Sequence, residues 1–105
     1  NPHGVFLVAE DDGQIVGFLY ADSDDLDRQF AHTWACIMYV VVAPEARGRG
    51  IAQNLYDGCE KRLRELGVTD VYSFASVAGD GAIVKFFEKQ GFARGHEYVW
   101  MDKKL

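Results

Sequence analysis

A glycine-rich segment between an apolar run and an amphipathic run is the part of this sequence best suited to bind an anion. It reads Arg47, Gly48, Arg49, Gly50, Ile51 and Ala52. A strand that ends in such a turn and opens a helix presents backbone N–H groups without intrahelical partners, at the positive end of the helix dipole. The glycines allow a close approach to the backbone, and the arginines add charged donors. The segment is therefore predicted to hold a phosphate.

The alternative interpretation is a tight turn with surface arginines, because short glycine motifs often occur by chance. The apolar run before the segment and the amphipathic run after it favour the anion site. The segment lacks the Lys-Ser/Thr pair of a P-loop, and it also lacks the third glycine and the distant acidic residue of the dinucleotide-binding fingerprint. The expected phosphate loop is therefore of another kind.

The pattern of apolar residues predicts the strands and helices that position this loop. Strands are expected over residues 5–10, 15–21, 34–43 and 70–77, with one or two closing strands within 92–105. Helical spacing predicts helices over residues 51–66 and 82–90, ended by Gly67 and Gly91, with Asp80 as a cap of the second. The Asp-Gly turn at 11–13 indicates a hairpin between the first two strands.

This order of elements predicts an α/β fold, called α+β in some schemes. Antiparallel strands come first and two strand–helix crossovers follow, so the expected architecture is a mixed, mostly antiparallel sheet with two helices. The length of 105 residues predicts one domain over residues 1–105.

Composition and charge argue against several classes of protein. The hydrophobic fraction of 49% is typical of a globular chain, and the net charge of −5 disfavours a nucleic-acid binder. No apolar run approaches the roughly 18 residues that cross a bilayer, so no membrane contact is expected. Cys36 and Cys59 lie in apolar patterns without metal-ligand spacing, which predicts buried reduced thiols in a cytoplasmic protein and no metal site; the alternative is a disulfide between them.

Two separate motifs resemble the GNAT superfamily of N-acetyltransferases. The pattern Arg47-x-x-Gly50-x-Ala52, after a Val-x-Pro strand end, is similar to that family's (Gln/Arg)-x-x-Gly-x-(Gly/Ala) signature. Residues 82–92, which end in Glu-Lys-x-Gly-Phe, resemble the family's second helix. The first hairpin and the last residues are also similar, so the resemblance covers essentially the whole chain in the right order.

The resemblance implies an acetyl-CoA-dependent N-acetyltransferase, in which a small-molecule or protein amine attacks the thioester directly. It implies that backbone N–H groups of residues 47–52 hold the pyrophosphate of coenzyme A. Backbone groups of Val40 and Val42 would pair with the pantetheine arm as an added strand, at a splay between the strands at 34–43 and 70–77. Phe87, on the second helix, would lie beside the thioester sulfur.

The sequence departs from the family pattern at places that bear on catalysis and assembly. Gly79 and Phe87 stand where the family often has Asn and Tyr, and no acidic residue stands at 38–39 on the central strand. The strand and helices that usually precede the hairpin are absent from this sequence. We therefore expect either a fragment or a homo-oligomer or partner segment that covers the hairpin side, near residues 5–10.

The departures leave the proton carriers open. Tyr98 and Tyr39 are the candidate catalytic residues, and the further candidates are Tyr72, His96 and Glu10. The ordinary alternative for each is a packing or surface role. The aspartates at 22, 24, 25 and 27 could attract a cationic acceptor, although such acidic runs usually form a solvated loop.

Two functions of different classes fit these features. The first is the N-acetyltransferase, and the second is a non-catalytic acyl-CoA-binding regulatory module, which the missing tyrosine and acid favour. A nucleotide-phosphate binder of another family is set aside by the second motif. Turnover of acetyl-CoA with a panel of amines separates the first two.

Overall fold

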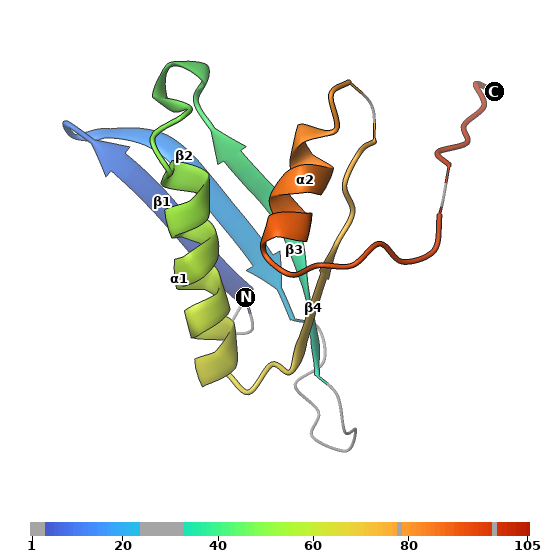
Figure 1. Ribbon diagram of the computed structural model, residues 1–105, viewed down its shortest axis with the longest axis horizontal. Coiled ribbons are helices and arrows are strands. Elements are labelled where there is room, and N and C mark those ends of the chain that lie inside the picture. The colour runs from blue at the N-terminus through green and yellow to red at the C-terminus, as the bar shows by residue number, and fades with distance from the viewer. Residues whose placement is uncertain (1–3, 24–32, 78, 98) are drawn as a thin grey trace. The chain divides into compact units, whose positions relative to one another are not determined.

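A computed structural model describes residues 4–23, 33–77, 79–97 and 99–105 of the chain (Figure 1). The chain forms two compact units, Asn1–Phe74 and Ala75–Leu105, each with its own packing. The expectation of one domain over residues 1–105 stays a prediction. Neither of the two described helices has the length and apolar character needed to cross a membrane.

The first unit is a four-stranded sheet with one helix packed on it (Figure 1). Its elements are β1 (Gly4–Asp11), β2 (Gln14–Asp22), β3 (Trp34–Val42), the short 3₁₀ helix η1 (Pro44–Ala46), α1 (Ile51–Glu65) and β4 (Asp70–Ser73). The strand order is β1-β2-β3-β4; the first two pairs are antiparallel and β3–β4 is parallel. The predicted mixed, mostly antiparallel sheet is therefore confirmed.

A two-residue turn joins β1 to β2, as the Asp-Gly pair predicts. Asp12 and Gly13 have φ values of 50° and 77°, and Asp11 pairs directly with Gln14. Positive φ at both central residues is the type I′ geometry, whose twist matches that of the flanking strands. The turn therefore sets the register of the two pairs next to it, and a bulge at Val16 shifts the register of the rest of the hairpin.

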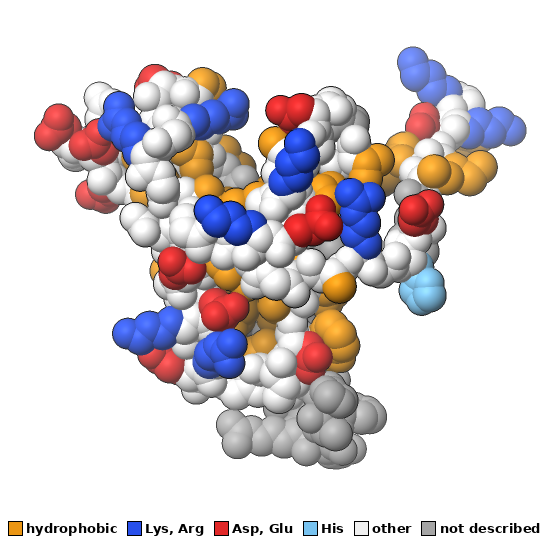
Figure 2. Space-filling model, viewed as in Figure 1, with side chains coloured by type: hydrophobic (Ala, Val, Ile, Leu, Met, Phe, Trp, Pro, Cys, Tyr) orange, Lys and Arg blue, Asp and Glu red, His pale blue; other side chains and the backbone are white. Residues whose placement is uncertain are grey.

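The helix α1 covers one face of the sheet with its apolar stripe. Its buried residues are Leu55, Tyr56, Cys59 and Leu63, and the fully buried Leu19 and Ala21 of β2 point to the same side. Acidic and basic side chains mix on its outer surface (Figure 2), where Arg64 pairs with Glu60 at 3.6 Å. The amphipathic pattern read from the sequence is thus confirmed.

The end of α1 is closed by backbone bonds to Gly67, whose φ is 87°. The Gly67 N–H donates to the Arg64 carbonyl at 3.1 Å, and the Val68 N–H donates to the Leu63 carbonyl at 3.0 Å. These two bonds form a Schellman motif, which satisfies the last carbonyls of a helix. The predicted role of Gly67 is confirmed.

The strand β4 is shorter than the sequence predicts. It spans Asp70–Ser73, and residues 74–77 are not part of a strand. β4 pairs only with Trp34–Ile37 of β3, and the register of β3 against β2 shifts just beyond, where Met38 is the extra residue. The β3–β4 ladder thus ends at the residue before the bulge, and bulges often terminate pairing.

The second unit contains α2 (Ala82–Lys89) and the segment after it. The N-cap residue of α2 is Gly81 and not the predicted Asp80, which lies one residue earlier and accepts a hydrogen bond from the Ala82 N–H at 3.0 Å. At the other end, the Phe92 N–H donates to the Phe87 carbonyl at 3.0 Å, and their ring centroids lie 4.9 Å apart. This is a second Schellman motif, with the apolar contact that often accompanies it.

The closing strands expected within residues 92–105 are not found. Residues 92–97 and 99–105 form no strand, and their large side chains Val99, Trp100 and Met101 are exposed. A strand requires a neighbouring backbone to complete its ladder, and this segment pairs with no described strand. The correction follows from pairing, which the β-rich composition of the segment does not determine.

Candidate functional site

The C-terminal half of β3 has a backbone edge with which no described strand pairs. The Ala43 N–H donates to the Val16 carbonyl of β2 at 2.8 Å. Because successive residues of a strand direct their polar groups to opposite sides, the N–H and C=O groups of Val42 and Val40 point away from β2. On that side the β3–β4 ladder ends at the Ile37–Ser73 pair. The ladder therefore ends where the predicted splay would begin, and the splay itself stays a prediction, because residues 75–77 belong to the second unit.

Two features define the closed end of this opening. The Ser73 hydroxyl donates to the Ile37 carbonyl at 2.8 Å and fastens the last paired residues together. Immediately beyond, the register of β3 against β2 shifts between Tyr20 and Ala21, which makes Met38 a bulge residue. Bulges redirect side chains and end pairing, and they are frequent next to active sites. The pairing of β3 with β4 therefore stops at Ile37, directly before the bulge at Met38.

The opening leads into the glycine-rich loop and the first turn of α1. Gly48 and Gly50 have φ values of 80° and 77°, and Gly50 is the N-cap residue of the helix. No side chain caps this helix, and no acidic residue lies in its first turn, which begins with Ile51 and Ala52. A Cβ added at Gly48 or Gly50 would meet no atom within 4 Å. The glycines are therefore required by their left-handed backbone and leave an open surface above it.

The two arginines of the loop are engaged within the protein. The Arg47 Nε donates to the Val42 carbonyl at 3.3 Å, on the open edge of β3. The Arg49 Nη1 pairs with Asp11 at 2.9 Å, and its Nη2 donates to the Glu45 carbonyl at 3.5 Å. Both pairings are exposed, so an incoming anion can compete for the guanidinium groups.

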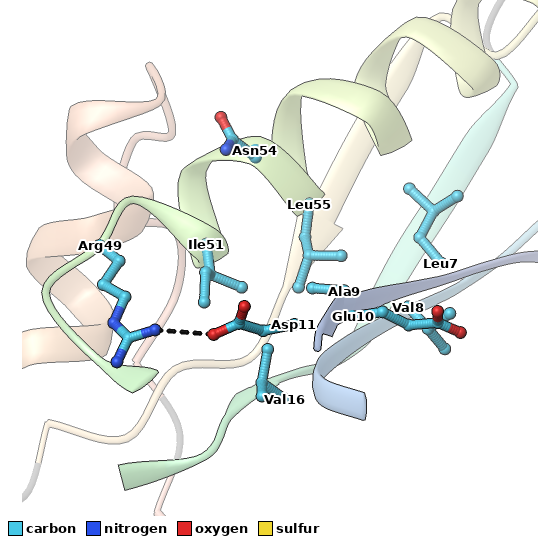
Figure 3. Close-up of a pocket in the computed structure, with 10 residues that line it drawn as sticks. All are labelled: Leu7, Val8, Ala9, Glu10, Asp11, Val16, Arg49, Ile51, Asn54 and Leu55. Atoms are coloured by element: carbon cyan, nitrogen blue, oxygen red, sulfur yellow. Dashed lines mark hydrogen bonds and ion pairs between the residues drawn. The ribbon is translucent and has the colours of Figure 1, made fainter. Parts of the chain in front are cut away.

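A cavity of about 500 Å³ lies on the β1 side of α1 (Figure 3). Apolar side chains from the strands and from α1, including Leu7, Val16 and Leu55, line it together with the Arg49–Asp11 pair. None of its lining residues belongs to β3 or β4. It is therefore a groove between the hairpin and the phosphate loop, separate from the opening.

The candidate catalytic residues are placed unequally. Tyr39 lies on β3 directly after the bulge, is exposed, and has its ring 6.5 Å from that of Phe18. Tyr98 lies outside the described residues, as do the aspartates at 24, 25 and 27. Phe87 is buried in the second unit against Phe86 and Phe92. Its place beside the thioester sulfur stays a prediction.

The further candidates are not gathered at the opening. Glu10 lies on β1, which is separated from β3 by β2. Tyr72 lies on β4 with its ring 6.0 Å from that of Trp34, and His96 is exposed in the second unit. Glu10 is therefore not positioned to act as a base where β3 and β4 separate.

The two cysteines are buried and are not joined in a disulfide, as the sequence predicts. Burial, together with the nearby charge of Glu60, raises the pKa of Cys59 to about 11. Burial also raises the pKa of Tyr56, and so does its hydrogen bond of 2.9 Å to Glu60.

Among the described residues there is no cluster of three or more His, Cys, Asp or Glu side chains that could hold a metal ion.

Sequence reasoning missed Ser73 and the bulge at Met38. A polar residue in an otherwise apolar strand pattern was the available signal for Ser73. The bulge has no local signal, because it is a property of the register between β2 and β3.

Comparison with known proteins identifies relatives over most of the chain. The model of the Acetyltransferase (GNAT) family matches residues 1–92. An acetyltransferase of Sodalis glossinidius is 32% identical over 102 residues, which is 96% of this chain and 66% of that protein. The chain spans between 42% and 66% of the lengths of the curated relatives that it matches.

Solved structures show the same fold. A transcriptional regulator from Bacillus halodurans superposes with a TM-score of 0.82 at 27% identity, over 98% of this chain and 68% of that one. The aminoglycoside N-acetyltransferase AAC(6')-Iy, in complex with CoA, has a TM-score of 0.79 at 21% identity, over 98% of this chain and 78% of that one. At that identity the second likeness concerns the fold alone.

Proposed function

The chain belongs to the GNAT family of acetyltransferases, and on that premise we propose that it is an acetyl-CoA-dependent N-acetyltransferase. The observation that carries the proposal is the continuous path from the unpaired edge of β3 to the uncapped start of α1. The fold neighbour in complex with CoA supports the choice of ligand. Neither of the two buried cysteines is in a disulfide, which supports a reducing compartment such as the cytoplasm.

The loop at residues 47–52 is the proposed pyrophosphate site. Its left-handed Gly48 and Gly50 leave room for phosphate oxygens close to the backbone, and the first turn of α1 lacks a side-chain cap. N–H groups at a helix start, together with the helix dipole, favour an anion there. Arg47 and Arg49 would exchange their present exposed partners for phosphate oxygens.

The open edge of β3 is the proposed site for the pantetheine arm. Val40 and Val42 direct their backbone groups into the opening, and an amide-bearing arm can pair with such groups as an added strand. The Val42 carbonyl already accepts a hydrogen bond from Arg47, so the arm must displace this side chain or share the carbonyl with it. The thioester would then reach the bulge at Met38, where β3 and β4 separate.

The proposed reaction is direct acetyl transfer. The lone pair of a neutral amine forms a bond to the thioester carbonyl carbon, which gives a tetrahedral adduct with a positively charged nitrogen. The C–S bond then breaks and the sulfur leaves as a thiolate, while a base or a water chain takes the proton from the nitrogen and the thiolate is protonated. A backbone N–H on the open edge of β3 can stabilise the oxyanion, and one such donor is worth about 3 kcal/mol in related chemistry. Tyr39 is the described candidate for moving a proton at this end of the opening; Tyr98 stays a candidate from the sequence.

A non-catalytic acyl-CoA-binding module is the second candidate function. Phe87 favours it, because a buried phenyl ring against Phe92 carries no hydroxyl to protonate a leaving thiolate. Binding of coenzyme A alone fits both functions. Release of free thiol from acetyl-CoA on addition of a mixed panel of amines is expected for the enzyme and not for the module.

The cofactor site is tested by Gly50→Val with Gly13→Val as the matched control. Both glycines have a φ of 77° and no atom within 4 Å of an added Cβ, so the backbone strain is similar. Gly50→Val should remove most of the coenzyme A binding measured by calorimetry, and Gly13→Val should retain it. Equal affinity for the wild type and Gly50→Val would contradict the proposed phosphate site.

A further inference from the structure

We infer that the acceptor is an amine carried on an aromatic body, and that four exposed rings beside the opening bind it. These rings, called the aromatic rim below, are Trp34, Tyr39, Tyr72 and Phe74. The inference rests on the proposed function, because it names the substrate class of the same site. It differs from what the fold alone suggests, since the fold neighbour described above acts on aminoglycosides.

The register places the rim on the sheet face opposite α1. Asp22 and Tyr20 of β2 share one face, and they pair with Cys36 and Tyr39 of β3 across the bulge. The other face of β2 holds the fully buried Leu19 and Ala21, which point to α1. Tyr39 therefore lies on the face that α1 does not cover.

The remaining rings follow from the β3–β4 pairing. Cys36 pairs with Tyr72, so Tyr72 shares the face of Tyr39, and Trp34 lies two residues before Cys36 on the same side. The Trp34 and Tyr72 rings meet edge to face at 6.0 Å, and the Tyr72 and Phe74 rings do so at 6.0 Å. Trp34, Tyr72 and Phe74 thus form one cluster of rings that spans both strands, and Tyr39 lies on the same face of β3.

This surface borders the place where β3 and β4 separate. The last pair is Ile37–Ser73; Tyr39 lies two residues beyond it on β3, and Phe74 follows it directly on the other strand. Trp34 and Tyr72 lie at the paired base of the same two strands. An amine that reaches the thioester from the face opposite α1 must therefore pass along the rim.

The chemistry of the rim suits an aromatic amine. The exposed fractions are 49% for Trp34, 56% for Tyr39, 41% for Tyr72 and 77% for Phe74, so ring surface is available to a ligand. Aromatic rings stack on one another and attract organic cations, which is the state of a free alkyl amine at neutral pH. Asp22 and Asp70 lie on the same face, since they pair with Cys36 and Trp34. Their negative charge favours a cation over a neutral or anionic molecule.

The test compares phenethylamine with butylamine and with the aminoglycoside neamine. Thiol release from acetyl-CoA is measured for each amine, and binding of coenzyme A is measured separately by calorimetry. Phenethylamine should have a kcat/KM at least about 10-fold above that of butylamine, because each aromatic contact adds about a factor of 2 to 12. Equal values, a preference for neamine, or no turnover of phenethylamine would overturn the inference.

Variants locate the effect on the rim. Trp34→Ala and Phe74→Ala should each raise the KM for phenethylamine about 3- to 10-fold and leave its kcat, the KM for butylamine and coenzyme A binding unchanged. Phe6→Ala is the control, since Phe6 is a 63% exposed ring on the same face of the outer strand β1. An equal rise in KM for Phe6→Ala would overturn the assignment to the rim. If the wild-type protein does not bind coenzyme A, this result would instead contradict the proposed function itself.

Discussion

Gly17 is the residue on which the approach of α1 to the sheet depends. A Cβ at this position would lie 2.9 Å from the Val41 carbonyl oxygen and 3.3 Å from the Ile51 Cγ2. The first contact is with backbone, which cannot move aside without distorting the β2–β3 ladder. The second is with the first residue of α1, so the position of the phosphate loop depends on the absence of this side chain.

We therefore predict that Gly17→Ala lowers the free energy of unfolding by about 1–3 kcal/mol, the usual cost of inserting volume into a packed site. Gly95→Ala is the control, because an added Cβ there meets no atom within 4 Å. Urea denaturation measures both. A Gly17→Ala protein as stable as the Gly95→Ala protein would show that the ladder adapts at no cost.

The Cys59 thiol should be chemically silent in the folded protein. It is fully buried, and burial raises its pKa to about 11, above the usual value of a thiol. At about pH 8 the reactive thiolate is scarce and inaccessible, so iodoacetamide should modify Cys59 only after denaturation. Mass spectrometry of native and urea-treated samples measures the difference; rapid native labelling at this site would contradict the packing of α1.

The same shift has a consequence for stability at high pH. Because folding raises the thiol pKa, the unfolded chain loses this proton first as pH rises. The stability that the protonated Cys59 thiol contributes to the fold is fully present below about pH 9 and is lost between about pH 9 and about pH 11. Tyr56, whose pKa is also raised, changes stability in the same direction.

At the scale of elements, the Arg49–Asp11 pair ties the phosphate loop to the end of β1. The two side chains are 57% and 52% exposed, so the pair should contribute less than about 1 kcal/mol to stability. The pair should affect ligand binding by the loop more than the stability of the fold, since Asp11 competes with phosphate for the Arg49 guanidinium.

We predict that Asp11→Asn changes the unfolding midpoint little but raises the salt sensitivity of coenzyme A binding, because the released Arg49 is free to meet phosphate. A double-mutant cycle with Arg49→Gln, read by calorimetry at two salt concentrations, measures the coupling. Arg94→Gln with Glu88→Gln is the control cycle, because these residues form an exposed pair of 3.8 Å in the second unit. Identical salt dependence in the wild type and Asp11→Asn would remove Arg49 from the ligand site.

At the scale of the whole molecule, the outer strand β1 exposes apolar side chains beyond those of the rim. Phe6 and Val8 are 63% and 43% exposed, and the Phe6 ring stacks on Phe18 at 5.9 Å. An outer strand also presents unpaired backbone groups, which favour pairing with another chain. This region coincides with the hairpin side on which the sequence predicts a covering partner or a second copy.

We predict that this protein self-associates with a concentration dependence that Phe6→Lys weakens, because a charge on an edge strand opposes association. Sedimentation velocity over a range of concentrations measures it. Ile15→Lys is the comparison, as Ile15 is equally exposed at 63% but lies next to the turn. A monomer at all concentrations, or an equal effect of both substitutions, would place the association elsewhere or exclude it.

The sequence by itself determined the elements whose signals are local. The Asp-Gly turn, the helical stripe of α1 and the glycines that end both helices each depend on neighbours within a few residues, and all are found. The glycine-rich loop at the start of α1 was predicted for the same reason, since a positive φ at Gly50 is a property of one residue.

Only the tertiary structure decided the features that depend on pairing between distant strands. The bulge at Met38, the end of the β3–β4 ladder at Ser73 and the shared face of the aromatic rim follow from register, which no single strand contains. The predicted closing strands within residues 92–105 were wrong for this reason, because a β-rich segment forms a strand only beside a partner. The opening that makes the site is likewise an absence of pairing, set by how far β3 and β4 run together before the bulge separates them.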